Sequence, residues 1–180
     1  MMVAARRDRA DVVALLLDLG MSPDIDDAQQ GGQRPLHVAA YSGSARVAAL
    51  LIERGAEIDP VDSIHGGTPL WFAMWGQRPR TIDLLSCFSR DVWALAFTAN
   101  VERLREVLKA EPRLATLGGF ETPPLMWLPD DEALAIEIVE LFLSHGADPT
   151  IRNMQGMTAA DLASKRGLDD VAELLRSKTA

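Results

Sequence analysis

A repeat with a period of about 34 residues constrains this chain more than any other feature. The segment RPLHVAAYSGSARVAALL at 34–51 aligns throughout with TPLWFAMWGQRPRTIDLL at 68–85. The segment 1–24 fits the same template, with Ala4 and Ala5 over Ala39 and Ala40. Three later segments continue the pattern, at 91–108, 121–149 and 157–175. We therefore expect five to six similar units, and we assign residues 1–180 to a single domain.

Each unit is predicted to be a hairpin of two helices. Pro35 and the pair Thr68 and Pro69 are strong helix starts, because a capping residue and a first-turn proline both favour initiation. Gly20, Gly55 and Gly146 stand where a second helix would end in a left-handed residue. One hairpin cannot bury both of its apolar faces, so neighbouring hairpins must stack. The sequence therefore predicts an all-α solenoid.

The repeated motifs resemble the ankyrin repeat. They are TPL at Thr68, PLHVAA at Pro35, GAEID at Gly55 and GADP at Gly146, and the resemblance covers nearly the whole chain. It implies an ankyrin-like stack of helix-turn-helix repeats joined by short β-turn fingers. It also implies that the histidine of the PLH motif, His37, hydrogen-bonds adjacent repeats together and has a structural role.

One finger is expected to be missing. The stretch from Leu51 to the helix start at Thr68 is long enough to form a finger, but the equivalent stretch from Leu85 to Arg90 is far shorter. A harmless deletion and a functional notch both remain open, because loops tolerate changes in length.

The segment TPPLMWLPDDEALAIEIV at 122–139 departs from the template in another way. It holds about three extra residues between its two predicted helices, and Pro129 is expected to end the first. Asp130, Asp131 and Glu132 then fall in the first turn of the next helix, where the helix dipole favours negative charge. We expect capping rather than a metal site or an acid/base pair, since no histidine or further acid lies at ligand spacing.

The two ends of the chain also differ. GLDDVAELLRSKTA closes on a polar helix, as a capping repeat should. Met1 and Met2 stand within a first helix that has no N-cap, which leaves an apolar edge uncovered. Either the natural chain extends upstream, or this edge meets a partner or a second copy.

Composition excludes several classes of protein. A net charge of −8 and a pI near 4.8 argue against binding to nucleic acid or to an anionic membrane surface. No stretch has the length of a membrane span, and the apolar run after Arg6 and Arg7 is too short to favour a targeting signal. The single cysteine, Cys87, is expected to be buried and fits a reducing compartment, so we expect a cytoplasmic protein.

Motifs of catalysis are missing from the sequence. His37, His65 and His145 form no constellation with a nucleophile, and no glycine-rich phosphate loop, nucleophile elbow or cysteine metal pair occurs. We therefore expect neither enzymatic activity nor a cofactor or metal.

A row of aromatic residues is the strongest binding signal. In an ankyrin-like stack the residue after the two small residues of each first helix faces the concave side. In successive units this residue is Arg6, Tyr41, Trp75, Phe97 and Lys165. Large exposed aromatics are common interface anchors, although these rings could instead fill grooves between helices. Trp71 and Trp93 occupy the histidine slot, where we expect them to pack inside and to replace a polar tie with bulk.

The predicted function is a non-catalytic protein-protein interaction module that binds a partner protein or peptide on its concave face. The alternative is a structural, self-assembling solenoid that associates through the N-terminal edge, or a fragment of a larger protein whose activity lies outside this chain. The predicted partner-binding residues are Tyr41, Ser42, Trp75, Phe97, Thr98, Arg6, Arg7, Lys165 and Arg166.

Overall fold

Helices begin where the sequence places prolines and capping residues. The computed structural model describes residues 1–117 and 122–179. Helices α3 (Pro35–Ser42) and α5 (Pro69–Trp75) both start on a first-turn proline. Thr68 caps α5, because its hydroxyl accepts a hydrogen bond from the Trp71 N–H at 3.3 Å. Local sequence chemistry thus sets the start of these helices.

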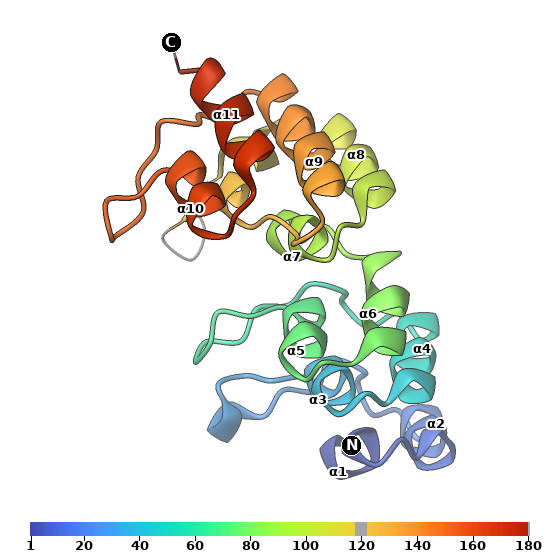
Figure 1. The fold of residues 1–180 in the computed structure, drawn as a ribbon. Coiled ribbons are helices and arrows are strands. Elements are labelled where there is room, and N and C mark those ends of the chain that lie inside the picture. Colours follow the sequence, from blue (N-terminus) through green and yellow to red (C-terminus); the bar gives the residue numbers. More distant parts are fainter. Residues whose placement is uncertain (118–121, 180) are drawn as a thin grey trace. The chain divides into compact units, whose positions relative to one another are not determined.

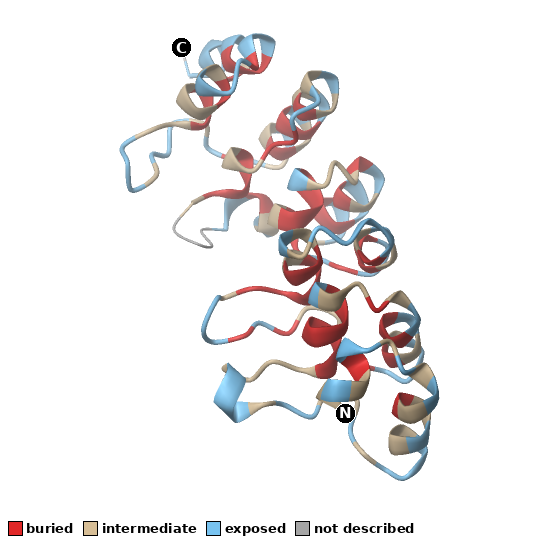
Figure 2. Cartoon of the chain, turned by 60° about the horizontal axis from the view of Figure 1, so that its bottom comes forward, coloured by how far each residue is buried: buried red, intermediate tan, exposed pale blue. Residues whose placement is uncertain are grey.

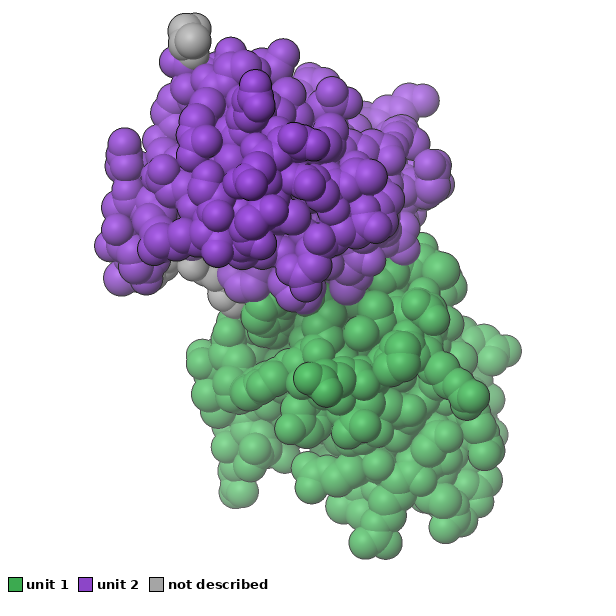
Figure 3. Space-filling view, in the orientation of Figure 1, with its two compact units in different colours: residues 1–91 green, residues 92–180 purple. Residues whose placement is uncertain are grey.

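The first of two compact units is Met1–Asp91 (Figure 3). It contains three helix hairpins. The first helices α1, α3 and α5 pack in one row, and the second helices α2, α4 and α6 pack in another (Figure 1). The remaining elements of this unit are α1 (Met2–Arg6), α2 (Ala10–Asp18), the 3-10 helix η1 (Ala28–Gln30), α4 (Ala45–Glu53) and α6 (Pro79–Ser86).

The second unit, Val92–Ala180, has the same two rows but one irregular member. The 3-10 turn η3 packs against both α7 and α10, where a first helix was expected. The prediction that this helix continues to Pro129 is wrong: it is a single turn, since Pro129 lacks an N–H and disfavours the helical conformation of the residue before it. The elements are α7 (Val92–Phe97), α8 (Val101–Ala110), η2 (Pro112–Thr116), η3 (Pro124–Met126), α9 (Glu132–Ser144), α10 (Ala159–Lys165) and α11 (Asp169–Ser177).

The fold class is all-α, as predicted. The described residues form eleven α-helices and no β-strand, and an isolated bridge joins Asp27 to Gln33 at the base of a finger. Gly20, Gly55 and Gly146 have φ angles of 89°, 81° and 87°, which confirms the left-handed helix ends.

Small buried residues let neighbouring helices approach closely. Buried positions line the inner faces of the helix rows, and exposed positions lie on the outside and at the finger tips (Figure 2). The small residues at the centres of the first helices are Ala39, Ala40, Ala73, Ala96 and Ala163, all buried. Cys87 is exposed, so the expectation of a buried cysteine is wrong. It lies just after the end of α6, and its thiol donates to the Asp83 carbonyl at 3.2 Å.

The predicted loss of one finger is confirmed. Residues 87–91 connect α6 to α7 without a finger. They are held by Asp59, whose carboxylate accepts from the Ser89 hydroxyl at 2.6 Å and from the Arg90 N–H at 2.7 Å. The Thr68 hydroxyl donates to Asp91 at 2.6 Å. Burial raises the pKa of Asp59, and the bonds from Ser89 and Arg90 partly offset that rise. Short polar ties therefore replace the finger.

Candidate partner-binding site

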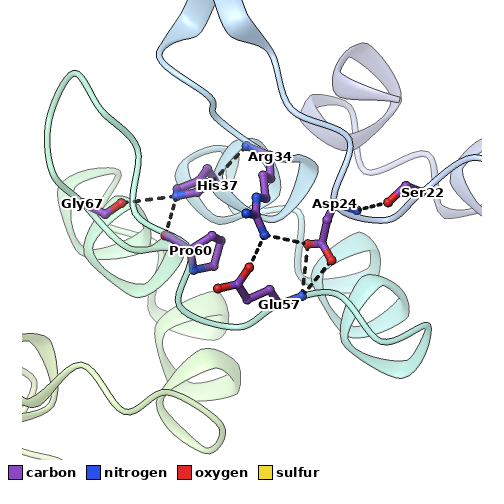
Figure 4. Close-up of polar contacts among 7 residues, drawn as sticks. All are labelled: Ser22, Asp24, Arg34, His37, Glu57, Pro60 and Gly67. Carbon is purple, nitrogen blue, oxygen red and sulfur yellow. Dashed lines mark hydrogen bonds and ion pairs between the residues drawn. The ribbon is translucent and has the colours of Figure 1, made fainter.

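The second finger is the loop between α4 and α5. Its base is held by His37, which is fully buried (Figure 4). The Arg34 N–H donates to Nδ1 at 3.1 Å, so Nδ1 is an acceptor and the proton resides on Nε2. Nε2 lies 3.0 Å from the Pro60 carbonyl oxygen and 3.2 Å from the Gly67 carbonyl oxygen, and so donates to them. This confirms the structural role of His37. Burial lowers the pKa of His37, which keeps the ring neutral.

A network of ion pairs and hydrogen bonds links the second finger to the first, which is the loop between α2 and α3. The Arg34 guanidinium pairs with Glu57 and lies 3.4 Å from the Asp24 carboxylate, which in turn accepts the Glu57 N–H at 3.1 Å (Figure 4). Together these bonds hold the finger bases at a fixed distance from α3.

The turn of the second finger is organised by Asp62, a buried carboxylate. Burial raises the pKa of Asp62, but hydrogen bonds outweigh that effect and leave the pKa lowered. The donors are the Gly67 N–H at 3.0 Å, the His65 N–H at 3.1 Å and the His65 ring Nδ1 at 2.8 Å. Asp62 therefore fixes the orientation of the His65 ring.

His65 completes a cluster of rings on α3, α5 and the second finger. Its ring meets Trp75 edge-on at 5.2 Å between centroids and Phe72 at 5.6 Å. Tyr41 meets Trp75 edge-on at 5.9 Å. Tyr41 and Trp75 nevertheless keep 47% and 56% of their surface exposed. Such edge-to-face geometry is favourable for aromatic pairs.

These rings border an open depression of about 210 Å³, which we call the aromatic groove. Its lining combines an apolar floor with a few polar groups, as binding sites commonly do. It is lined by Arg6, Gln33, His37, Val38, Tyr41, Ser42, His65, Phe72 and Trp75.

The first unit brings four predicted site residues together at this groove, namely Arg6, Tyr41, Ser42 and Trp75. Arg7 is exposed but does not line it. Sequence reasoning missed His65. Its location in a finger was the available signal, but its contact with the groove depends on the Asp62 bond.

The predicted residues of the second unit have different surroundings. Phe97 is 46% exposed and meets Trp127 edge-on at 6.3 Å. The Thr98 hydroxyl donates to the Ala94 carbonyl at 2.7 Å. Lys165 is exposed, whereas the Arg166 guanidinium donates to the Leu128 carbonyl at 2.8 Å and to Asp130 at 2.6 Å. Arg166 is therefore already engaged within its own unit.

Trp71 and Trp93 are both half-buried in the histidine slot. The Trp93 indole N–H donates to the Thr122 carbonyl at 3.1 Å. The expectation that Trp93 replaces a polar tie with bulk alone is therefore wrong, because the indole retains a donor aimed at the next finger.

The acidic run 130–132 caps helices only in part: Glu132 lies in the first turn of α9 and Asp131 is its N-cap, but Asp130 lies before the helix and pairs with Arg166, so placing it in the first turn is wrong. Asp131 accepts the Leu134 N–H at 3.1 Å, and Glu132 accepts the Asp170 N–H at 2.9 Å at the start of α11. The described residues include no group of three or more histidine, cysteine, aspartate or glutamate side chains that could hold a metal ion. No helix within the described part of the chain is long and apolar enough to cross a membrane.

Stacked helix hairpins with fingers tied at their bases define a helical repeat protein. A family model described as ankyrin repeats (3 copies) matches residues 1–95. The chain belongs to the ankyrin repeat family.

Similar proteins support this assignment. The ankyrin repeat protein YahD of Escherichia coli (strain K12) is 24% identical over 193 residues, covering 97% of this chain and 92% of that protein. The palmitoyltransferase ZDHHC13 of Danio rerio is 28% identical over 166 residues, covering 90% of this chain; the chain spans only 21% of that relative's length. A crystal structure of an ankyrin repeat domain from Acinetobacter baumannii AYE superposes with a TM-score of 0.65 at 22% identity, covering 98% and 95% of the two chains. This likeness shows the fold. Ankyrin repeats are generally protein-protein interaction modules, and their fold is typically non-catalytic.

Proposed function

We propose that this chain is a non-catalytic binding module that grips a partner protein or an extended peptide through the aromatic groove. One observation carries the proposal: Tyr41 and Trp75 stay about half exposed at the border of an open depression. Large aromatic side chains dominate binding energy at interfaces, because they bury much area and lose few rotamers.

The backbone of Tyr41 and the ring of Trp75 are both held by neighbouring residues, and such preorganisation favours binding. The Arg78 Nε donates to the Tyr41 carbonyl at 2.9 Å, and Gly76 packs so closely that an added Cβ would collide with the same carbonyl oxygen. His65 supports the Trp75 ring edge-on. A preorganised surface pays a smaller ordering cost on association, so more of the contact energy appears as affinity.

The charge of the lining favours an acidic or neutral partner segment. Arg6 lines the groove, and none of the described residues that line it is acidic. We include Arg7, Phe97, Thr98, Lys165 and Arg166 as further contact residues, with the cations steering association more than adding affinity. We place the module in the cytoplasm, as the single exposed cysteine suggests.

The test is a double variant, Tyr41→Ala with Trp75→Ala. Peptides selected from a displayed random library on the wild-type chain are titrated against both proteins by calorimetry. We expect the variant to lose more than ~2 kcal/mol of binding energy, about thirtyfold in affinity, with its melting temperature nearly unchanged.

The control is Leu15→Ala with Leu19→Ala, two exposed apolar residues of α2 and its end, outside the groove. This control should bind the peptides as the wild type does. Unchanged affinity in the aromatic variant would refute the proposal, and an equal loss of folding stability would assign the two rings to the core.

A second candidate function is self-association through α1 and α2. Val3, Leu15 and Leu19 expose 67%, 58% and 75% of their surface. Exposed apolar side chains are common where proteins associate. Sedimentation at two protein concentrations tests it: a mass that rises with concentration, and that Leu15→Ala with Leu19→Ala abolishes, would support assembly.

A further inference from the structure

The second helices of the first unit begin in different electrostatic surroundings. At the start of α4, the Asp8 carboxylate reaches over from the preceding repeat and accepts the Val47 N–H at 3.1 Å. The register of the repeats places Gly43 at the position of Asp8, and Thr81 at the position of Val47. The start of α6 therefore lacks the carboxylate that caps α4.

Other second helices in the described residues have an acidic or amide group at this end. Asn100 caps α8 by accepting the Arg103 N–H at 3.2 Å, and Asp131 and Glu132 serve α9 and α11. Helix α2 has Asp11 in its first turn. Helix α6 has neither a side-chain cap nor an acid in its first turn. The partial positive charge of its N-terminus is left uncompensated.

Two arginines add to that charge. A depression of about 240 Å³ at the start of α6 is lined by Ser42, Gly43, Gln77, Arg78, Arg80 and Thr81, among others, and none of the described residues that line it is acidic. Arg80 is exposed and makes no hydrogen bond or ion pair with any described residue. Arg78 uses Nε to hold the Tyr41 carbonyl. A cationic hollow on a chain of net charge −8 is a local exception.

Thr81 is an independent sign of a ligand. It lines the same depression and is fully buried, yet its hydroxyl has no hydrogen-bond partner in the described part of the chain. The equivalent residue on α4 is the apolar Val47. A buried hydroxyl without a partner is destabilising, so its presence needs an explanation.

We propose that the start of α6 is a subsite for a phosphate monoester, carried by a phosphorylated side chain of the partner. A dianionic phosphate with three acceptor oxygens suits two guanidinium groups and the N-terminus of a helix. Ser42 lines both this depression and the aromatic groove, so the phosphate would lie next to the anchoring rings. The identity of the carrier rests on the proposed function, whereas the phosphate subsite itself does not.

The first experiment uses inorganic phosphate as the probe. Backbone amide shifts of the full chain are followed by NMR at constant ionic strength, with acetate as the comparison anion. We expect saturable shifts at residues 76–82 with phosphate and much weaker ones with acetate. Arg80→Gln should weaken phosphate binding by about tenfold or more, since it removes charge-assisted hydrogen bonds.

Two further variants sharpen this result. Arg46→Gln is the matched control, because Arg46 holds the equivalent position on α4, which Asp8 already caps. It should bind phosphate as the wild type does. Gly43→Asp should abolish binding by supplying the absent carboxylate. If that variant does not fold, Arg80→Gln still decides the matter. The absence of saturable shifts, equal binding of acetate, or an equal loss in Arg46→Gln would overturn the subsite.

The second experiment tests the carrier. Displayed peptides with a fixed phosphoserine are compared with their serine counterparts on the wild-type chain. We expect the phosphorylated peptides to bind at least about tenfold more tightly, an advantage that Arg80→Gln removes. The double variant Tyr41→Ala with Trp75→Ala should lose the peptides but retain inorganic phosphate. Peptide binding with no preference for phosphoserine would overturn this inference and leave the proposed function standing. Phosphate binding without peptide binding would refute the proposed function.

Discussion

The two units tie their fingers with different side chains in the same slot of the repeat. In the first unit, His37 bonds three backbone groups: it accepts the Arg34 N–H and donates to the carbonyls of Pro60 and Gly67. In the second unit, Trp93 donates its indole N–H to the Thr122 carbonyl. His37 and Trp93 thus both place a ring N–H against a backbone carbonyl beyond their own helix.

The repeat that contains η3 shows a second change beside the replacement of histidine by Trp93. The Trp127 indole donates to the Thr122 hydroxyl at 2.8 Å, so both indoles meet at Thr122. This residue leads into η3, the single turn that stands in for a first helix. The comparison teaches that in the first unit one side chain, His37, makes all three hydrogen bonds of this slot, whereas in the second unit two indoles share Thr122.

The strongest test of this difference between the two units is the substitution His37→Ala. It removes a fully buried ring and leaves three backbone groups without their partner. We expect a loss of about 2–4 kcal/mol in the free energy of unfolding, combining a cavity with unpaired polar groups. Urea unfolding followed by circular dichroism measures it. His145→Gln is the control: that ring is partly buried and bonds within its own helix end, so the change should cost little. A loss below about 1 kcal/mol in His37→Ala would show that contacts other than those of His37 hold the finger.

Much of the fold was predictable because its determinants are local. Pro35, Pro69 and Gly55 start and end helices by their own backbone preferences, and the repeat carried that information along the chain. Register also placed Tyr41 and Trp75 at one depression, since both occupy the same position of the repeat.

The parts that sequence missed depend on contacts between distant residues. His65 lines the aromatic groove because a buried Asp62 turns its ring. The hydrogen bond of Trp93 depends on the position of Thr122, which is distant in the sequence. Pro129 leaves only the single turn η3 where a longer helix was predicted. Cys87 is exposed and lies directly after Ser86, the last residue of α6. None of these follows from periodicity.

A milder way to weaken the second finger, whose base His37 holds, is to lower the pH. Burial lowers the pKa of His37 from the usual 6.5, so the unfolded state binds a proton more readily than the folded state. The stabilisation is complete above the unfolded pKa and is lost as the pH falls from there towards the folded pKa. Protonation would also place an N–H at Nδ1 against the Arg34 N–H.

We expect His37 to contribute at most about 1.4 kcal/mol of lost stability per pH unit in this window. The measurement is urea unfolding at pH 7.5, 6.5 and 5.5. His37→Gln, which does not titrate, should flatten the pH dependence; the slope shared by both proteins belongs to other groups. An identical slope in the two would show that His37 is not the residue responsible.

The smallest expected effect comes from Trp93→Phe, which keeps an aromatic ring and removes the indole N–H. One hydrogen bond to a backbone carbonyl is worth about 1 kcal/mol, and Trp127 still holds Thr122 through its hydroxyl. We therefore expect a loss near that value, with faster hydrogen exchange in α7 and α8 and unchanged exchange in α3. The double variant Trp93→Phe with Trp127→Phe should lose more than the sum of the two single changes, because Thr122 then has neither indole. Additive losses would mean that the two indoles act separately. A Trp93→Phe loss as large as that of His37→Ala would instead mean that the second unit relies on this slot as heavily as the first.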